Sequence, residues 1–258
     1  MRLAIDVGNS TITLGVFAND RLLGTWRLTT DEGASVDEHG LRLTGVLALA
    51  GIDVDAVSSV VMCSVVPPVT TQLAQCVRTY LSHEPLVVAA GVKTGVTLRH
   101  DNPRDIGADR IANLVAFTSR YTAPGIVVDC GTAISVDLID TDGAFAGGVI
   151  APGIVTASEA LRRTTARLPR VELVTPPRVA GRSTVESVQA GIVYGFAGMI
   201  DGLVQRLAKE QGEDMNQMTV VLTGGSAPIV AGALETETVD DPWLTLHGLS
   251  VIASRNRV

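Results

Sequence analysis

Two short polar segments with the same chemistry each follow an apolar stretch of the chain. Asp6 opens the run Asp-Val-Gly-Asn-Ser-Thr at residues 6–11, and Asp129 opens Asp-Cys-Gly-Thr-Ala at residues 129–133. Each run predicts a buried strand ending in a carboxylate, a glycine turn with polar side chains, and a second strand. Successive N–H groups in such a turn bind anions, and a carboxylate beside phosphate needs a cation or water between them. The duplication therefore predicts a clamp for a nucleoside triphosphate and its cation, which indicates phosphoryl transfer.

Each segment also has a plain structural explanation. Asp, Gly and Asn are common in turns, so either run could be a polar hairpin that binds nothing. The repetition favours the functional interpretation, in which Gly131 permits close backbone approach and Thr132 donates to a phosphate oxygen. The sequence has no Walker A motif, which excludes a P-loop protein.

The run Gly-Ala-Asp-Arg at residues 107–110 lies at the end of the longest expected loop and opens a helix. Arg110 suits bidentate binding of a carboxylate, and Asp109 suits accepting a proton from a hydroxyl that attacks phosphorus. The alternative is an Asp–Arg pair at a helix start, where the helix dipole favours Asp. Spacing alone favours that alternative.

A glycine pair after a later strand, in Thr223-Gly224-Gly225-Ser226, is a third candidate site. Glycines there let a flat ring lie against backbone, and the following helix N-terminus favours anions. A tight strand-to-helix turn explains the same residues equally well.

The elements expected around these segments form two similar halves. Each half begins with three hairpin-linked strands, at residues 2–7, 12–18 and 21–28, and again at 125–129, 134–140 and 144–150. Each continues with alternating helices and strands, and capping-box spacing predicts helix starts at Ser35 and Ser183. The pattern predicts mixed sheets covered by helices in two similar domains, 1–118 and 119–258.

Composition narrows the class of protein. The net charge of −7 and the pI near 5.1 disfavour nucleic-acid binding, which needs basic surface. The most apolar stretch, residues 190–200, is 11 residues long, whereas a membrane helix needs about 20. An acid after three apolar residues at the start argues against a signal peptide, and three cysteines without CxxC spacing indicate buried thiols in a reducing compartment. We therefore expect a cytoplasmic protein with no membrane partner.

The expected helix after Ser183 carries glycines at intervals of four, three and four residues: Gly191, Gly195, Gly198 and Gly202. They form one small-residue face suited to close packing against another helix. Packing within the domain is one explanation, and the seam of a homodimer is the other.

Five motifs taken together resemble the type III pantothenate kinases, of the acetate kinase/sugar kinase/Hsp70/actin superfamily, over essentially the whole chain. Two are the runs beginning at Asp6 and Asp129, and a third is Asp101-Asn102-Pro103 leading into residues 107–110. The others are Gly-Gly-Val-Ile-Ala-Pro-Gly at residues 147–153 and Gly-Arg-Ser-Thr at 181–184. The resemblance implies two ribonuclease-H-like domains of the actin-like ATPase type, each a mixed five-stranded sheet flanked by helices, with a cleft between them.

The same resemblance implies ATP-dependent phosphorylation of pantothenate to 4′-phosphopantothenate, the first step of coenzyme A biosynthesis. It places the ATP phosphates on Asp6, Val7, Gly8, Asn9, Ser10, Thr11, Ile12, Thr13 and Thr132. It assigns Mg²⁺, held through water, to Asp6, and a monovalent cation, K⁺ or NH₄⁺, to Asp129. Pantothenate is assigned to His100, Gly107, Ala108, Asp109, Arg110 and Thr184, with Asp109 as proton acceptor and Thr184 reaching across a homodimer interface.

One position departs from the family pattern. His100 stands where family members commonly have Tyr beside the pantothenate pocket, so a ring with a polar tip remains but its contact differs. A non-catalytic regulatory protein of the same fold is the alternative function, because a kinase-like fold does not guarantee turnover. The intact Asp6, Asp109, Arg110 and Asp129 favour the kinase.

Overall fold

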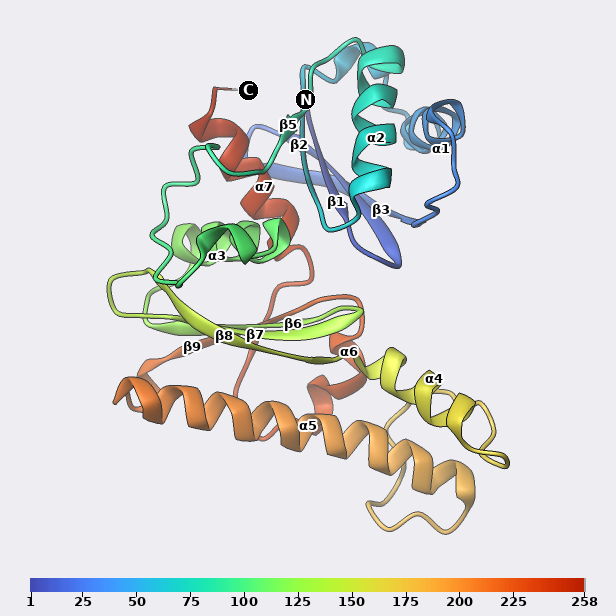
Figure 1. Ribbon diagram of the computed structural model, residues 1–258, viewed down its shortest axis with the longest axis vertical. Coiled ribbons are helices and arrows are strands. Elements are labelled where there is room, and N and C mark those ends of the chain that lie inside the picture. The colour runs from blue at the N-terminus through green and yellow to red at the C-terminus, as the bar shows by residue number, and fades with distance from the viewer. Residues whose placement is uncertain (258) are drawn as a thin grey trace. The chain divides into compact units, whose positions relative to one another are not determined.

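The computed structural model describes residues 1–257, apart from the side chain of Asn216, and divides into two compact units (Figure 1). Unit 1 contains residues 1–96 and 102–120 together with the chain from Leu244 onward. Unit 2 contains residues 97–101 and 121–243. The chain therefore leaves unit 1 twice, briefly at residues 97–101 and then for residues 121–243, before it returns to unit 1 at Leu244.

Unit 1 is built on a five-stranded sheet in the order β3-β2-β1-β4-β5. Its strands are β1 (Arg2–Val7), β2 (Thr11–Ala18), β3 (Arg21–Thr29), β4 (Ser59–Ser64) and β5 (Leu86–Val87). The first three strands are antiparallel, whereas β4 and β5 run parallel to β1. The helices are α1 (Val36–Leu49), α2 (Pro67–Tyr80), α3 (Ala108–Arg120) and α7 (Leu244–Arg255), with short 3₁₀ turns at Val54–Ala56 and Pro103–Asp105.

The central strand β1 is covered on both faces, which explains its nearly continuous apolar sequence. Leu3, Ile5 and Val7 point into a core shared with Leu43 and Leu47 of α1 and with residues of α2. The side chain of Ala4, which points to the opposite face, is also fully buried. Burial on both faces fixes the direction and depth of the strand that delivers Asp6.

Unit 2 repeats this arrangement, with a five-stranded sheet in the order β10-β9-β6-β7-β8. Its strands are β6 (Gly125–Cys130), β7 (Ala133–Ile139), β8 (Phe145–Pro152), β9 (Thr219–Thr223) and β10 (Val239–Asp240). Its helices are α4 (Ile154–Thr164), α5 (Thr184–Gln211) and the short α6 (Ala227–Val230), with 3₁₀ turns at Met215–Gln217 and Ala231–Ala233. Read from the first hairpin outward, both sheets have the same strand order, and the expected pair of mixed five-stranded sheets flanked by helices is confirmed.

The last helix does not stay with the second half of the sequence. Of the two compact units, α7 belongs to unit 1. The reason is close packing: a Cβ on Gly248 would overlap the backbone of Ala112 in α3, and Thr245 Oγ1 donates to Asn113 Oδ1 at 2.8 Å. Arg2 of β1 also donates to Ser250 and Ser254 of α7. Whether the duplicated domains divide at 118/119 stays a prediction.

Both predicted helix starts have the expected N-cap. The Ser35 side chain accepts from Glu38 N while Glu38 accepts from Ser35 N, which completes a capping box. Ser183 accepts from Glu186 N at 3.2 Å, but Glu186 turns to Arg182 N instead, so this box is half formed. The helix expected after the Gly224–Gly225 pair is short, since α6 ends at Val230 and passes into a 3₁₀ turn.

Candidate active site

The first glycine turn joins β1 to β2 and is held by backbone and threonine contacts. Gly8 N donates to Thr11 O at 3.0 Å, which closes the turn. Thr30, just after β3, donates from Oγ1 to Gly8 O at 2.7 Å and from its N–H to Ser10 O at 3.1 Å. Asn9 and Ser10 are exposed at the tip. The turn therefore presents polar side chains on a fixed backbone.

Not every residue expected to contact ATP here presents its side chain. Val7 and Ile12 are 0% and 1% exposed, and both side chains belong to the core of unit 1. Any contact that these two make with a ligand is therefore through the main chain. Thr11 and Thr13 are half-buried.

Asp6, at the end of β1, pairs in register with Thr13 on β2 and with Cys63 on β4. The Cys63 thiol donates to Asp6 Oδ1 at 3.2 Å and is fully buried. Burial raises the pKa of Cys63 well above its usual value, and the nearby carboxylates of Asp6 and Asp109 raise it further. The thiol is therefore a neutral donor to Asp6, a contact that sequence reasoning missed.

The 107–110 segment lies at the first turn of α3, close to the same thiol. Asp109 Oδ1 accepts from Arg110 N at 2.8 Å, and its carboxylate lies against Gly107, where a Cβ would overlap it. A Cβ on Gly107 would also lie 3.9 Å from Val65, just beyond β4. Asp6 lies beside the Cys63 thiol of β4, and Asp109 lies against Gly107, which is next to Val65 just after β4, so both carboxylates are at the carboxyl ends of β1 and β4. This is where open α/β sheets bind ligands.

The second glycine turn, between β6 and β7, is closed by similar contacts. Gly131 N donates to Ala133 O at 3.0 Å. The carbonyl of Thr132 accepts from Gly153 N at 3.1 Å and from Thr156 Oγ1 at 2.8 Å. Asp129 pairs in register with Ser135 on β7 and with Thr223 on β9. The carboxylate thus occupies the same place in this sheet as Asp6 does in the first.

The glycine pair after β9 closes around this second carboxylate. Gly224 has φ +94°, and a Cβ on it would lie 2.5 Å from Asp129 Oδ1 and 2.6 Å from the Cys130 backbone. Ser226 N donates to Cys130 O at 2.9 Å. Burial, with a smaller contribution from Asp129, raises the pKa of Cys130 to about 12. The structure therefore brings the third candidate segment to the second turn.

The two remaining predicted substrate residues, His100 and Thr184, lie in unit 2 and are both exposed. The His100 ring is tilted against Phe145 at the start of β8, with ring centroids 6.1 Å apart. Thr184 is the first residue of α5, directly after the Ser183 cap.

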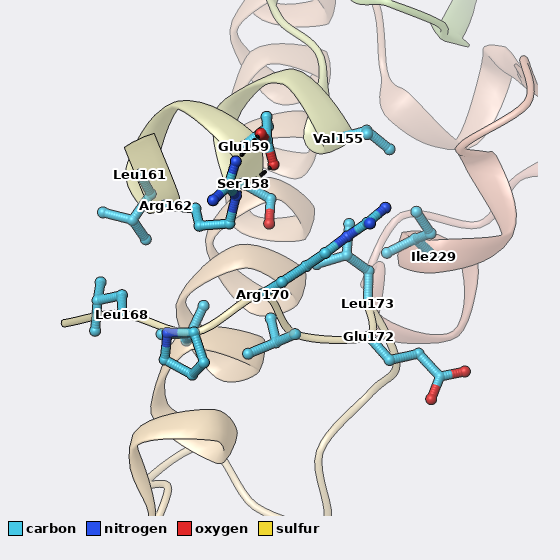
Figure 2. A pocket seen from close by; sticks show the side chains of 13 residues that line it. Val155, Ser158, Glu159, Leu161, Arg162, Leu168, Arg170, Glu172, Leu173 and Ile229 are labelled. Atoms are coloured by element: carbon cyan, nitrogen blue, oxygen red, sulfur yellow. Dashed lines mark hydrogen bonds and ion pairs between the residues drawn. The ribbon is translucent and has the colours of Figure 1, made fainter. Parts of the chain in front are cut away.

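A cavity of about 560 Å³ lies elsewhere in unit 2, between α4 and the segment 168–173, and none of the predicted site residues lines it (Figure 2). Its lining is mainly apolar, and Arg162 there is paired with Glu159 while Arg170 extends toward Ile229 (Figure 2). It is separate from the two turns in sequence and in its lining residues.

The described residues contain no group of three or more His, Cys, Asp or Glu side chains that could hold a metal ion. A magnesium ion held by one carboxylate, water and substrate phosphates needs no such group, because Mg²⁺ usually keeps several waters. Asp6 beside the first glycine turn fits that kind of site.

The shared strand order and the carboxylate-plus-glycine turn in each sheet define the duplicated α/β fold of the actin-like ATPase type. Solved structures agree on the fold: the activator of 2-hydroxyisocaproyl-CoA dehydratase from Clostridium difficile, solved with bound ADPNP, matches with a TM-score of 0.56 at 12% identity, covering 100% of this chain and 97% of that one. Component A of the Acidaminococcus fermentans (R)-2-hydroxyglutaryl-CoA dehydratase matches with a TM-score of 0.55 at 14% identity, covering 99% and 98%.

Within this class the chain belongs to the type III pantothenate kinase family, whose model matches residues 2–206. The type III pantothenate kinase of Moorella thermoacetica is 46% identical over 256 residues, covering 99% of this chain and all of that relative. The Geobacter sulfurreducens protein of the same name is 41% identical over 257 residues, covering the whole of both chains.

Proposed function

We propose that this protein transfers the γ-phosphoryl group of ATP to the primary hydroxyl of pantothenate, giving 4′-phosphopantothenate and ADP in the cytoplasm. The observation that carries the proposal is full-length membership of the type III pantothenate kinase family. The position of Asp6 and Asp109 at the carboxyl ends of β1 and β4 supports it, because one carboxylate can hold the cation while the other accepts the proton.

The phosphates of ATP bind along the first turn, on Asn9, Ser10, Thr11 and the backbone, with Thr132 of the second turn as a further donor. Asp6 holds Mg²⁺ through water, and Asp129 holds potassium or ammonium. These cations, when bound, neutralise charge that a protein of net charge −7 does not offset by itself.

Pantothenate binds through two of its groups, the carboxylate and the primary hydroxyl. Arg110 pairs with the carboxylate, and Asp109 accepts the proton of the primary hydroxyl as its oxygen bonds to the γ-phosphorus and the bond to the ADP oxygen breaks. Arg110 N donates to Asp109 Oδ1, which fixes the orientation of this carboxylate at the first turn of α3. Gly107, Ala108, His100 and Thr184 complete the substrate contacts.

The active form is a homodimer joined through the glycine face of α5. A Cβ added at Gly191, Gly195 or Gly198 would meet nothing within 4 Å, so this face has no partner inside the described chain. The exposed Val185 lies on the same helix, near Thr184. Helix α5 is long and apolar enough to cross a membrane by length and composition alone, a test that core helices of soluble proteins also pass, and 44% of its most apolar 18-residue window is buried inside the structure.

The decisive experiment is an ADP-release assay with Mg-ATP, with and without pantothenate and with potassium or sodium as the salt. We expect ADP only when pantothenate is present, and phosphopantothenate in equal amount by mass spectrometry. An absence of both products under every cation would overturn the proposal.

The proton acceptor is tested by Asp109→Asn. We expect turnover to fall by about 10²–10⁴-fold while ATP binding, measured by calorimetry, is retained. The matched control is Asp55→Asn, an exposed aspartate of the same unit, which should keep wild-type turnover. Near-wild-type turnover of Asp109→Asn would remove Asp109 from this role.

A further inference from the structure

Arg99 makes two ion pairs with the turn that joins β7 to β8. Its NH1 lies 2.6 Å from Asp140 Oδ2, and its NH2 lies 2.5 Å from Asp142 Oδ2. The Asp140 side chain is only 5% exposed, and its Oδ1 accepts the N–H groups of Asp142 and Ala144 at 2.9 Å each. The guanidinium therefore binds a carboxylate that is already fixed by the turn.

The backbone beside Arg99 is fixed to the same strand end. Arg99 N donates to Phe145 O at 2.8 Å, and Phe145 N donates to Thr97 O at 2.9 Å. This short parallel pairing explains why residues 97–101 belong to unit 2 although the chain on both sides of them belongs to unit 1. The segment is anchored from its backbone and from one side chain.

His100 follows Arg99 directly and rests on the same residue. Its ring lies against that of Phe145 with an interplanar angle of 41°. Phe145 is 2% exposed, so it gives the exposed His100 ring a rigid support. Isolated exposed ion pairs contribute little, but loss of Arg99 would leave a buried carboxylate without its cation.

We propose that Arg99 is a positioning residue for the substrate: through Asp140 and Asp142 it holds His100 on Phe145, in the orientation in which His100 meets pantothenate. This inference rests on the proposed function for the identity of the substrate. Arg99 itself touches no substrate. A purely structural role would weaken the fold without acting selectively on pantothenate.

Steady-state kinetics of Arg99→Met separate the two roles. We expect the KM for pantothenate to rise about fivefold to tenfold, with kcat and the KM for ATP within about twofold of wild type. Arg99→Lys should recover part of the effect because an ammonium can pair with one of the two carboxylates. Arg78→Met is the matched control, since Arg78 pairs with Glu84 through two hydrogen bonds in unit 1 and should leave both KM values unchanged.

A double-mutant cycle with His100→Ala tests the route. If Arg99 acts through His100, Arg99→Met adds nothing to the pantothenate KM of His100→Ala. An unchanged KM in the single Arg99→Met variant, or an equal rise in both backgrounds, would overturn the inference.

The NMR signal of the His100 ring gives a readout that does not depend on turnover. Packing against Phe145 shifts this signal by the ring current, and we expect Arg99→Met to move it toward the position of an exposed histidine while Arg78→Met leaves it in place. A His100 signal that does not respond to Arg99→Met refutes the positioning, whatever the enzyme's substrate. A wild-type protein that fails to phosphorylate pantothenate would instead refute the proposed function, and the NMR result would still decide whether Arg99 positions His100.

Discussion

The two glycine turns occupy the same place in their sheets but have different neighbours. Asp6 pairs with Thr13 on the antiparallel neighbouring strand and with Cys63 on the parallel one. Asp129 pairs in the same way with Ser135 and Thr223. A threonine after the third strand donates to a turn carbonyl in both cases, Thr30 to Gly8 and Thr156 to Thr132.

The difference lies in what surrounds each carboxylate. Asp6 receives a side-chain donor, Cys63, and has a second carboxylate, Asp109, nearby. Asp129 is closed in by backbone, because Gly224 leaves no room for a Cβ beside it. The two units share the same strand order, and the residues on the adjacent strands and helices make the surroundings of the two carboxylates different.

The largest effect is expected from a substitution at the first glycine turn. Asp6→Asn keeps the shape but removes the charge, and we expect kcat to fall by about 10²–10³-fold with a higher Mg²⁺ requirement. Magnesium titrations of activity measure both quantities. Asp20→Asn, in the exposed turn after β2, should behave as wild type. A fall in kcat of less than tenfold would contradict the proposal that Asp6 of the first turn holds Mg²⁺.

The next largest effect is expected from a substitution that disturbs the backbone packing around the second glycine turn. Gly224→Ala should displace Asp129, lower stability by about 1–3 kcal/mol and raise the potassium concentration for half-maximal activity, with the magnesium requirement unchanged. Gly225→Ala is the control, since a Cβ there meets nothing within 4 Å. Equal behaviour of the two variants in potassium titrations and thermal melts would contradict the close packing around Asp129.

A smaller effect sharpens the role of the thiol at the first turn. Cys63→Ala removes the donor to Asp6, and we expect the KM for Mg-ATP to rise about threefold to tenfold, while Cys63→Ser retains a donor and stays close to wild type. Cys76→Ala, at an equally buried thiol of α2, should lower the melting temperature without changing this KM. Identical kinetics for all three variants would show that Asp6 does not need the thiol.

The smallest effect compares the two turns through their cysteines. The pKa of Cys130 is raised to about 12 and that of Cys63 well above its usual value, so at pH 8 the native thiols stay protonated. We expect neither to react with iodoacetamide at pH 8, by mass spectrometry. Unfolded thiols ionise from about pH 8.5, so the unfolded chain binds fewer protons there and stability falls as pH rises further. Selective labelling of one cysteine would show that its turn opens.

Local signals in the sequence predicted most of the strands and helices. The hairpins at β1–β2 and β6–β7 follow from apolar runs that end in an aspartate and a glycine, and the Ser35 cap follows from Glu38 three residues later. These features depend on neighbours a few residues apart, which a single sequence contains.

Long-range features were not predictable in the same way. The Cys63–Asp6 contact depends on the register of a parallel pair 57 residues apart, and nothing in either segment fixes that register. The apolar face of α7 indicates that it packs, but not against which unit. The proposed roles of Asp109, Arg110 and His100 rest on family resemblance, because spacing alone favours an ordinary helix start at Asp109 and Arg110.

The return of α7 to unit 1 has a consequence for synthesis. Residues 244–255 leave the ribosome after all of residues 121–243, yet they cover β1 and α3, which were made first. Unit 2 can therefore complete its contacts while unit 1 still has an exposed apolar face. The half of the protein that is translated first is the half that finishes folding last, and during that interval it is the part most exposed to chaperones and to aggregation.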